Sequence, residues 1–307
     1  MRQNCLEQIK LNGIVVIYKE KDWTSFDVVA KLRGIFHEKR IGHGGTLDPM
    51  AEGVLPVFVG KAARACDMLP DETKAYVAGF KLGIATDTLD VTGKILEKKQ
   101  AFCKKEQVAD ALQGFVGEIM QVPPMYSAIK INGKKLYDLA REGKTVERQP
   151  RKVTVMAIDL LEFDEKTQEG KISVSCKKGT YIRSIIDDLG QKLGCGAVMT
   201  TLERTASAGF TKEQAMTISQ VESLFETEGE KLLMSVEKAF DDVYNGRVYL
   251  SERLTGLYKN GVKLSVGQEG MTVEKGSGRM LAYGFDGEFL GLCCEIDGVI
   301  KQVKNFY

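Results

Sequence analysis

The protein has 307 residues, of which 43% are hydrophobic and 28% charged, a composition typical of soluble globular chains. Its 43 Lys and Arg residues balance 42 Asp and Glu residues. The formal charge of +1 argues against a protein that coats nucleic acid nonspecifically, and it still allows a local basic groove. Seven scattered cysteines without a C-x-x-C pair, with two histidines, argue against a disulfide framework and a zinc site.

The sequence has no segment typical of a membrane or secreted protein. Its longest apolar runs, near residues 14–17 and 54–59, are far shorter than the roughly 18 residues of a membrane span. Residues 1–10 have no apolar stretch after their charges, so they do not predict a secretory signal. We therefore expect a cytoplasmic protein without a membrane partner.

The first part of the chain alternates between predicted strands and helices. Residues 13–19 are rich in β-branched residues, typical of a buried strand. Thr24 followed by Asp27 resembles a capping box and predicts a helix. A glycine-rich loop over residues 42–49 precedes another apolar strand. Strand-like alternation over residues 74–83, a polar turn over 86–93 and a helix over 105–115 follow.

The composition changes at residue 123. Residues 123–152, called here the basic segment, hold eight basic residues against three acidic ones and are predicted to project from the core. Strands resume over residues 153–163 and 171–176. Residues 179–194 then predict a strand end, a turn and a helix that stops before Gly194.

The last third divides into an acidic connector and a small module. Residues 219–242, the acidic connector, hold seven carboxylates and two lysines and predict solvated helices. The turn dipeptides Asn260-Gly261, Asp286-Gly287 and Asp297-Gly298 indicate a β-rich module. We place a domain boundary near Tyr249, which divides the chain into residues 1–248 and 249–307.

The strongest candidate for chemistry is the loop Gly42-His43-Gly44-Gly45-Thr46-Leu47-Asp48-Pro49. Glycines allow backbone shapes closed to other residues, and Pro49 keeps Asp48 out of the helical region, so the loop can present a carboxylate. An ordinary turn is an equal alternative on local grounds. A glycosidase-like pair of Asp48 with Glu52 would need a helix that Pro49 and Gly53 disfavour. The glycine spacing does not fit a nucleotide-binding loop.

A second cluster, residues 177–183, lies where a strand ends and a helix starts. An arginine in the first turn of a helix opposes the helix dipole, so Arg183 needs an acidic partner, for which Asp48 is a candidate. An ordinary surface arginine is the alternative. Tyr181 and Tyr76 could pack in the core or stack on a base.

Together, these segments resemble the bacterial TruB-type tRNA pseudouridine synthases, which isomerise uridine 55 in the T loop of tRNA. The resemblance covers most of residues 12–205. It rests on six segments in family order: the loop from Gly42 to Pro49 with Gly53 and Leu55-Pro56; Lys74-Ala75-Tyr76; Thr86-Asp87-Thr88-Leu89-Asp90 with Gly93; Pro123-Pro124-Met125-Tyr126-Ser127-Ala128-Ile129-Lys130; Gly133-Lys134-Lys135-Leu136-Tyr137; and Lys178-Gly179-Thr180-Tyr181-Ile182-Arg183 with Asp187-Asp188-Leu189-Gly190.

The resemblance implies roles for individual residues. Asp48 matches the catalytic aspartate, which either attacks C1′ or removes the 2′ proton, and the sequence does not choose between the two. Arg183 matches the arginine that pairs with it and keeps it ionised. Tyr76 matches the tyrosine that stacks on the flipped base and helps to remove the C5 proton. The other predicted substrate-binding residues are His43, Tyr181, Leu202, Lys19 and Lys130.

The resemblance also implies the fold and the partners. We expect an α+β pseudouridine synthase fold with a mixed, largely antiparallel sheet and a C-terminal PUA-like domain that touches the acceptor end of tRNA. The basic segment would grip the RNA as a thumb. No cofactor, metal or obligatory protein partner is implied, and we expect a monomer. Positive potential should gather on the basic segment and around Lys177, Lys178 and Arg183, with the acidic connector facing away.

One departure and three alternatives stay open. Residues 19–25 lack the proline and glycine that the family has after its lysine, so this loop is expected to differ in shape. The alternative functions are a synthase that acts on another RNA or through a guide RNA, an RNA-binding or tRNA-folding module, and a hydrolase that uses Asp48 and Glu52.

Overall fold

The computed structural model describes residues 11–307 except 70, 132, 242, 275 and 277. The predictions about residues 1–10, which include Cys5, and about Asp242 lie outside these ranges. Within them, no helix is long and apolar enough to cross a membrane.

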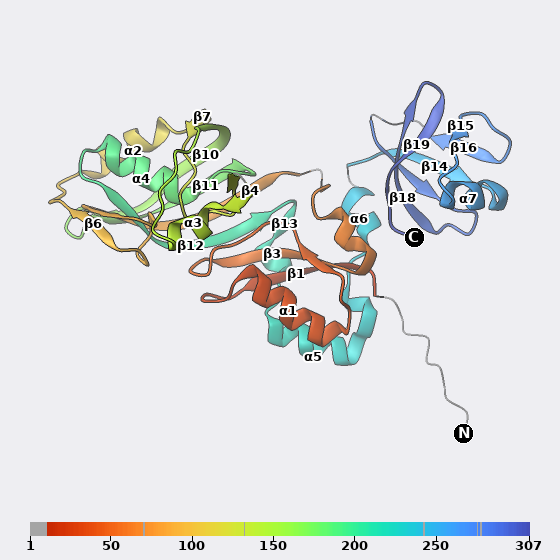
Figure 1. Ribbon diagram of the computed structural model, residues 1–307, viewed down its shortest axis with the longest axis horizontal. Helices are drawn as coiled ribbons and strands as arrows, with labels where there is room; N and C mark the ends of the chain where they lie inside the picture. Colours follow the sequence, from red (N-terminus) through yellow and green to blue (C-terminus); the bar gives the residue numbers. More distant parts are fainter. Residues whose placement is uncertain (1–10, 70, 132, 242, 275, 277) are drawn as a thin grey trace.

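A nine-stranded sheet forms the larger part of the molecule, in the order β1-β3-β12-β4-β11-β10-β7, with β2 beside β3 and β13 beside β12 (Figure 1). All neighbours are antiparallel except β3 and β12, which meet in a short parallel contact. This confirms the mixed, largely antiparallel sheet. The strands are β1 (Gly13–Lys19), β2 (Ile41–His43), β3 (Glu52–Val59), β4 (Thr73–Leu82), β7 (Gly117–Gln121), β10 (Arg151–Asp164), β11 (Glu169–Lys177), β12 (Ala197–Ser207) and β13 (Phe210–Thr211).

Three helices cover different parts of this sheet. Helix α1 (Ser25–Phe36) begins at the predicted Thr24 capping box and packs with β1 and β3. Helices α2 (Lys105–Gln113) and α4 (Ile182–Lys192) bury their apolar sides against β4, β10, β11 and β12. Gly194 follows α4 with a φ of 75°, which confirms its predicted place after the helix.

The acidic connector is helical, as predicted, but it is not simply solvated. It forms α5 (Ile218–Glu228), η3 (Gly229–Leu232) and α6 (Val236–Asp241). Ile218 and Val221 of α5 are buried, and Phe225 meets Phe36 of α1 edge-on with ring centroids 4.9 Å apart. Glu222, Glu226 and Glu228 are exposed, so α5 closes the core with one face and meets water with the other.

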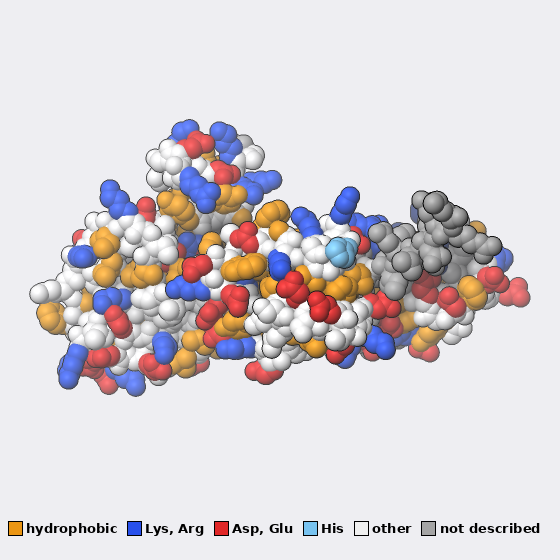
Figure 2. Space-filling view, turned by 90° about the horizontal axis from the view of Figure 1, so that it is seen from below, with side chains coloured by type: hydrophobic (Ala, Val, Ile, Leu, Met, Phe, Trp, Pro, Cys, Tyr) orange, Lys and Arg blue, Asp and Glu red, His pale blue; other side chains and the backbone are white. Residues whose placement is uncertain are grey.

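The basic segment lies between the end of β7 and the start of β10. It contains β8 (Lys130–Ile131), β9 (Lys134–Lys135) and α3 (Leu136–Arg141), around a small apolar cluster of Met125, Leu136 and Leu139. In Figure 2 it stands out as a knob above the long body, with several Lys and Arg side chains on its surface. The remaining short elements before residue 212 are β5 (Ile84–Thr86), β6 (Ile95–Lys98) and η1 (Gly60–Ala65), and η2 (Lys212–Gln214) follows β13.

A second, six-stranded sheet makes the C-terminal module. Its strands are β14 (Gly246–Leu250), β15 (Leu264–Ser265), β16 (Met271–Glu274), β17 (Met280–Tyr283), β18 (Phe289–Ile296) and β19 (Val299–Asn305), with helix α7 (Glu252–Lys259), which the sequence reading did not include. Tyr249 lies inside β14, so this sheet begins at Gly246. Leu281, Leu292 and Phe306 share one cluster with Phe58 and Phe240, which joins the module to the larger domain.

A close approach in the large sheet requires a glycine at position 53, where β3 meets β12. Its φ is 108°, and a Cβ there would collide with the carbonyl oxygen of Arg204. Gly34, near the end of α1, has nothing within 4 Å of the place where a Cβ would stand.

These two glycines should therefore respond in opposite ways to alanine. We expect Gly53→Ala to lower the free energy of unfolding by more than about 2 kcal/mol, because both its φ and its neighbour exclude a side chain. Gly34→Ala should raise it by about 0.5–1 kcal/mol through helix propensity. Urea unfolding of both variants measures this, and a Gly53→Ala protein as stable as the parent would contradict the packing described.

Candidate active site around Asp48

The candidate site is built on the loop between β2 and β3, which carries Asp48. The start of α1 anchors this loop. The Ser25 hydroxyl accepts the Leu47 N–H at 2.9 Å and donates to the Leu47 carbonyl at 3.2 Å. The Asp22 N–H donates to the Pro49 carbonyl at 2.8 Å. Both neighbours of Asp48 are thus fixed, which limits the positions that its carboxylate can take.

Lys19, predicted to bind substrate, lies beneath this loop. Its side chain is fully buried, and its Nζ donates to the carbonyls of Glu20 at 2.9 Å, Trp23 at 2.6 Å and Pro49 at 3.4 Å. Burial lowers the pKa of Lys19 to about 8, while the Asp48 carboxylate favours its charged form. A buried ammonium bonded to three carbonyls does not reach an RNA at the surface, so Lys19 is a positioning residue for the loop.

Residues 20–22, which lack the proline and glycine of the family pattern, form a turn with a backbone conformation that suits glycine. Asp22 stands where the family pattern has its glycine, and its φ is 68°. This is the left-handed region, which glycine adopts most easily and aspartate tolerates better than most residues. The altered sequence therefore keeps the backbone conformation that a glycine would supply.

Arg204 is a site residue that the sequence reading did not single out. Its side chain is fully buried in β12, and its guanidinium donates to the carbonyls of Val54 at 2.7 Å, Thr46 at 3.3 Å and Gly45 at 3.1 Å. It also lies against the Tyr76 hydroxyl. Strand alternation could have indicated it, since Arg204 shares a face of β12 with Leu202.

Arg183 makes the ion pair predicted for it. Its Nη2 lies 2.9 Å from Asp48 Oδ2, and its side chain is only 6% exposed. The same guanidinium donates to the carbonyls of Thr88 at 3.0 Å and Tyr126 at 2.8 Å. The arginine is therefore held by three chain segments, and it aims the Asp48 carboxylate from the first turn of α4.

A second carboxylate, Asp90, also faces this arginine. Its Oδ2 lies 3.5 Å from Arg183 Nη1, and its other oxygen accepts from the Thr88 hydroxyl and the Thr92 N–H at 2.8 and 3.0 Å. Asp90 belongs to one of the motifs quoted above, but no local pattern marks it as a partner of Arg183. Only the folded chain brings residues 48, 90 and 183 together.

The charge state of Asp48 depends on these neighbours. Its side chain is 37% exposed, so the carboxylate is accessible although it sits among buried groups. Desolvation raises the pKa of Asp48 above its ordinary value, and Asp90 adds to the increase, while Arg183 and Lys19 oppose it. Arg183 therefore favours the ionised form, as predicted, against the combined effect of burial and Asp90.

Aromatic and apolar side chains surround the ion pair. Tyr76 on β4 and Leu202 on β12 are each 8% exposed and belong to the same apolar cluster. Tyr181 precedes α4, and Gln121 holds its backbone by accepting the Tyr181 N–H at 2.8 Å and donating to its carbonyl at 3.0 Å. Burial raises the pKa values of both tyrosines, and Arg204 opposes this for Tyr76.

His43 lies at the start of the loop, whereas Lys130 lies apart. The His43 Nδ1 accepts the Gly45 N–H at 3.3 Å, and burial together with Arg204 lowers the pKa of His43. His43 is thus favoured as a neutral ring at the rim of the site. Lys130 is an exposed residue of β8 in the basic segment.

The sequence matches two family patterns. Residues 33–182 match the TruB family pseudouridylate synthase N-terminal domain, and residues 183–241 match the tRNA pseudouridylate synthase B C-terminal domain. A protein of Clostridium perfringens named tRNA pseudouridine synthase B is 45% identical over 83% of this chain and 85% of its own. A protein of Levilactobacillus brevis with the same name is 44% identical over 86% of this chain and 89% of its own length.

The chain belongs to the TruB family of pseudouridine synthases, and it is an enzyme. Two solved structures share this fold over 98% of the chain and 86% of their own. One is a Cbf5-Nop10-Gar1 complex, with a TM-score of 0.72 and 25% identity. The other is an H/ACA RNP bound to a substrate RNA that contains 2′-deoxyuridine, with a TM-score of 0.71 and 23% identity.

The structure argues against the hydrolase that would use Asp48 with Glu52. Glu52 begins β3, so the helix that would place both carboxylates on one face does not form. Glu52 lies instead close to the Tyr18 hydroxyl, which donates to Glu203 at 3.0 Å.

In this TruB-family site, neutralising Asp90 should shift the acid limb of the pH–rate profile. Asp90 raises the pKa of Asp48, so Asp90→Asn should lower this pKa and move the fall of kcat/KM at low pH to lower pH. The asparagine Oδ1 can still accept the bonds that Asp90 receives. Initial rates between pH 4 and 8 measure this. An acid limb that stays at the same pH or moves to higher pH in Asp90→Asn would contradict the effect of Asp90 on Asp48.

Removing the Arg204 guanidinium should destabilise the loop that carries Asp48. In Arg204→Met the carbonyls of Val54, Thr46 and Gly45 lose their donor, and we expect the free energy of unfolding to fall by about 3 kcal/mol. Arg33→Met is the matched control: Arg33 is exposed on α1 and contacts only the Phe26 ring among described residues. Its effect should stay within about 0.5 kcal/mol. Equal effects in the two variants, measured by urea unfolding, would refute the role of Arg204.

Proposed function

We propose that this protein converts uridine 55 in the T loop of tRNA to pseudouridine, without a cofactor and with Asp48 as the catalytic group. The observation that carries the proposal is the ion pair of 2.9 Å between Asp48 and the buried Arg183, on the loop where the family pattern has its catalytic aspartate. The names of the similar proteins supply the class of substrate.

The proposed reaction breaks the N1–C1′ bond, turns the uracil and joins C5 to C1′, after which the C5 proton leaves. The Asp48 carboxylate starts it in one of two ways, by attacking C1′ or by removing the 2′ proton. Arg183 aims the carboxylate and favours its ionised form. Both roles need an accessible carboxylate with a fixed orientation, which Asp48 has.

The aromatic and apolar walls suit a detached uracil. A base in a folded RNA loop must leave its stack to reach a buried carboxylate, so we propose that the enzyme flips the target nucleotide. Tyr76 is placed to stack on the uracil and to help remove the C5 proton. Burial raises the pKa of its hydroxyl, and Arg204 beside the hydroxyl opposes this increase. Tyr181 and Leu202 would line the rest of the uracil pocket.

The outer parts of the molecule would hold the rest of the tRNA. The basic segment projects from the sheet and keeps Lys130 and Lys134 exposed, which suits contacts with phosphates. His43, at the rim of the site, would contact the RNA loop around the flipped nucleotide. We propose that the C-terminal module touches the acceptor end, and that the protein acts as a monomer in the cytoplasm without an obligatory protein partner.

The direct test maps pseudouridine in an unmodified tRNA transcript incubated with the purified protein alone. We expect modification at position 55 by the wild type, and a loss of at least about 10⁴-fold in Asp48→Asn, because the amide neither attacks nor accepts a proton. Glu52→Gln is the matched control and should retain activity. A requirement for an added guide RNA, or an active Asp48→Asn protein, would refute the proposal.

A further inference from the structure

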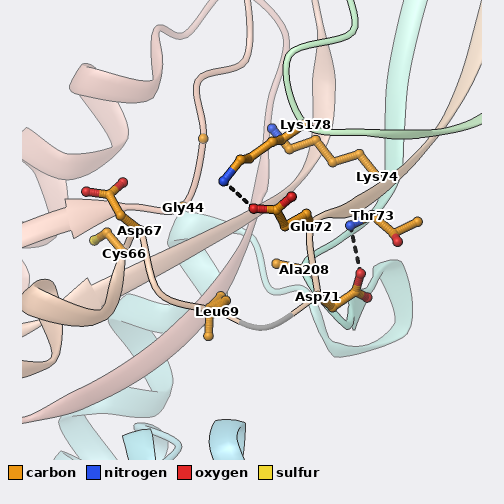
Figure 3. Close-up of a pocket in the computed structure, with 11 residues that line it drawn as sticks. Gly44, Cys66, Asp67, Leu69, Asp71, Glu72, Thr73, Lys74, Lys178 and Ala208 are labelled. Carbon is orange, nitrogen blue, oxygen red and sulfur yellow. Dashed lines mark hydrogen bonds and ion pairs between the residues drawn. The ribbon is translucent and has the colours of Figure 1, made fainter. Parts of the chain in front are cut away.

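A hollow of about 200 Å³ lies behind the loop that carries Asp48, and none of the roles proposed above accounts for it (Figure 3). Gly44 and Gly45 form one side of it. Lys74 at the start of β4 and Lys178 after β11 reach across it, and Asp71 and Glu72 lie at its opposite side. The hollow thus borders the catalytic loop three residues before Asp48.

Lys74 is the unusual group in this hollow. Its ammonium lies against Gly45: a Cβ added at Gly45 would lie 2.8 Å from Lys74 Nζ. Among the described residues, Lys74 has no hydrogen bond and no ion pair, whereas Lys178 beside it is paired with Glu72. An ammonium that is largely withdrawn from water and lacks an anion is unfavourable unless a ligand supplies one.

The charged neighbours make this position more positive. Arg204 from β12 and Lys178 both oppose the charge on Lys74, and only the Cys176 thiol on β11 favours it. Burial and these cations lower the pKa of Lys74 to about 8. His43 from β2 faces the same loop. Of the three carboxylates that line the hollow, Glu72 pairs with Lys178 and Asp71 accepts the Thr73 N–H at 2.7 Å, while Asp67 lies beside Cys66, apart from Lys74 (Figure 3).

We propose that Lys74 binds a phosphodiester of the RNA substrate close to the target nucleotide. This inference rests on the proposed function, because it needs a polynucleotide whose uridine occupies the Asp48 site. A single buried ammonium matches the single negative charge of a phosphodiester. Gly44 and Gly45 have no side chains, so the loop leaves room for a backbone to approach Lys74. The bound phosphate would then supply the anion that Lys74 lacks in the free protein.

The pH dependence of binding follows from the charge on Lys74. RNA affinity should fall as pH rises above about 8, because a neutral amine must then take up a proton to hold the phosphate. Lys74→Arg stays charged, so its RNA affinity should remain constant between pH 7 and 9. The RNA affinity of Lys74→Met should also be independent of pH in this range, but low throughout. The groups that face Lys74 are Arg204, Lys178, Cys176 and His43, and these are unchanged in both variants.

The experiment measures binding of an unmodified tRNA transcript by the full-length protein. We expect Lys74→Met to weaken binding about tenfold and to reduce the slope of log K against log salt by about 0.7–0.9, the loss of one phosphate contact. Lys81→Met is the matched control, since Lys81 lies on the opposite face of β4 in an exposed pair with Glu169. Its binding should equal that of the wild type.

Two further measurements separate this role from a structural one. Lys74→Met should melt at or above the wild-type temperature, because it removes an unpaired ammonium from a partly buried place. A transcript with a neutral methylphosphonate at one linkage near the target uridine should bind the wild type more weakly than the unmodified transcript does. Lys74→Met should bind the two transcripts equally. Unchanged affinity and salt slope in Lys74→Met would overturn the inference even if pseudouridine forms, whereas absence of pseudouridine with the wild type would overturn the proposed function.

Discussion

The site depends on one physical constraint, which is the burial of the Arg183 guanidinium. A charged group withdrawn from water is tolerated only when other groups compensate its lost hydration. Here the compensation comes from two carboxylates, Asp48 and Asp90, and from the carbonyls of Thr88 and Tyr126. These groups belong to the catalytic loop, to the turn after β5 and to the start of the basic segment. Satisfying one arginine therefore brings three distant segments together around Asp48.

A second buried arginine holds the same loop from its other side. Arg204 has no carboxylate partner among the described residues, and it is satisfied by the carbonyls of Gly45, Thr46 and Val54. Its backbone comes so close to β3 that only a glycine fits at position 53. The parallel contact of β3 with β12 is therefore more than a detail of topology, since it places this guanidinium under the loop and beside Tyr76.

The charge of the molecule is polarised, although not entirely as its sequence suggested. The sequence predicts positive potential around Lys177, Lys178 and Arg183, and ion pairs reduce the contribution of two of these residues, because Lys178 pairs with Glu72 and Arg183 with Asp48 and Asp90. In the basic segment, Lys144 pairs with Glu142, but Lys130 and Lys134 stay exposed. A charge count along a sequence omits such pairing, because many ion pairs, such as Lys178 with Glu72, join residues that are distant in the chain.

The sequence by itself determined several main strands, the start of α1 and the position of Asp48, because these depend on neighbouring residues: alternation in β4, the Thr24 capping box, and glycines beside Asp48-Pro49. The family motifs also pointed to the pairing of Arg183 with Asp48. Tertiary structure alone decided the rest. It buried Lys19 under the loop, placed Asp90 on Arg183, gave Arg204 its three carbonyls and left Lys74 unpaired beside Gly45. The reason is that burial and ion pairing at this site are set by contacts between distant segments, such as Gly45 and Arg204, which are 159 residues apart, and no local pattern encodes such contacts.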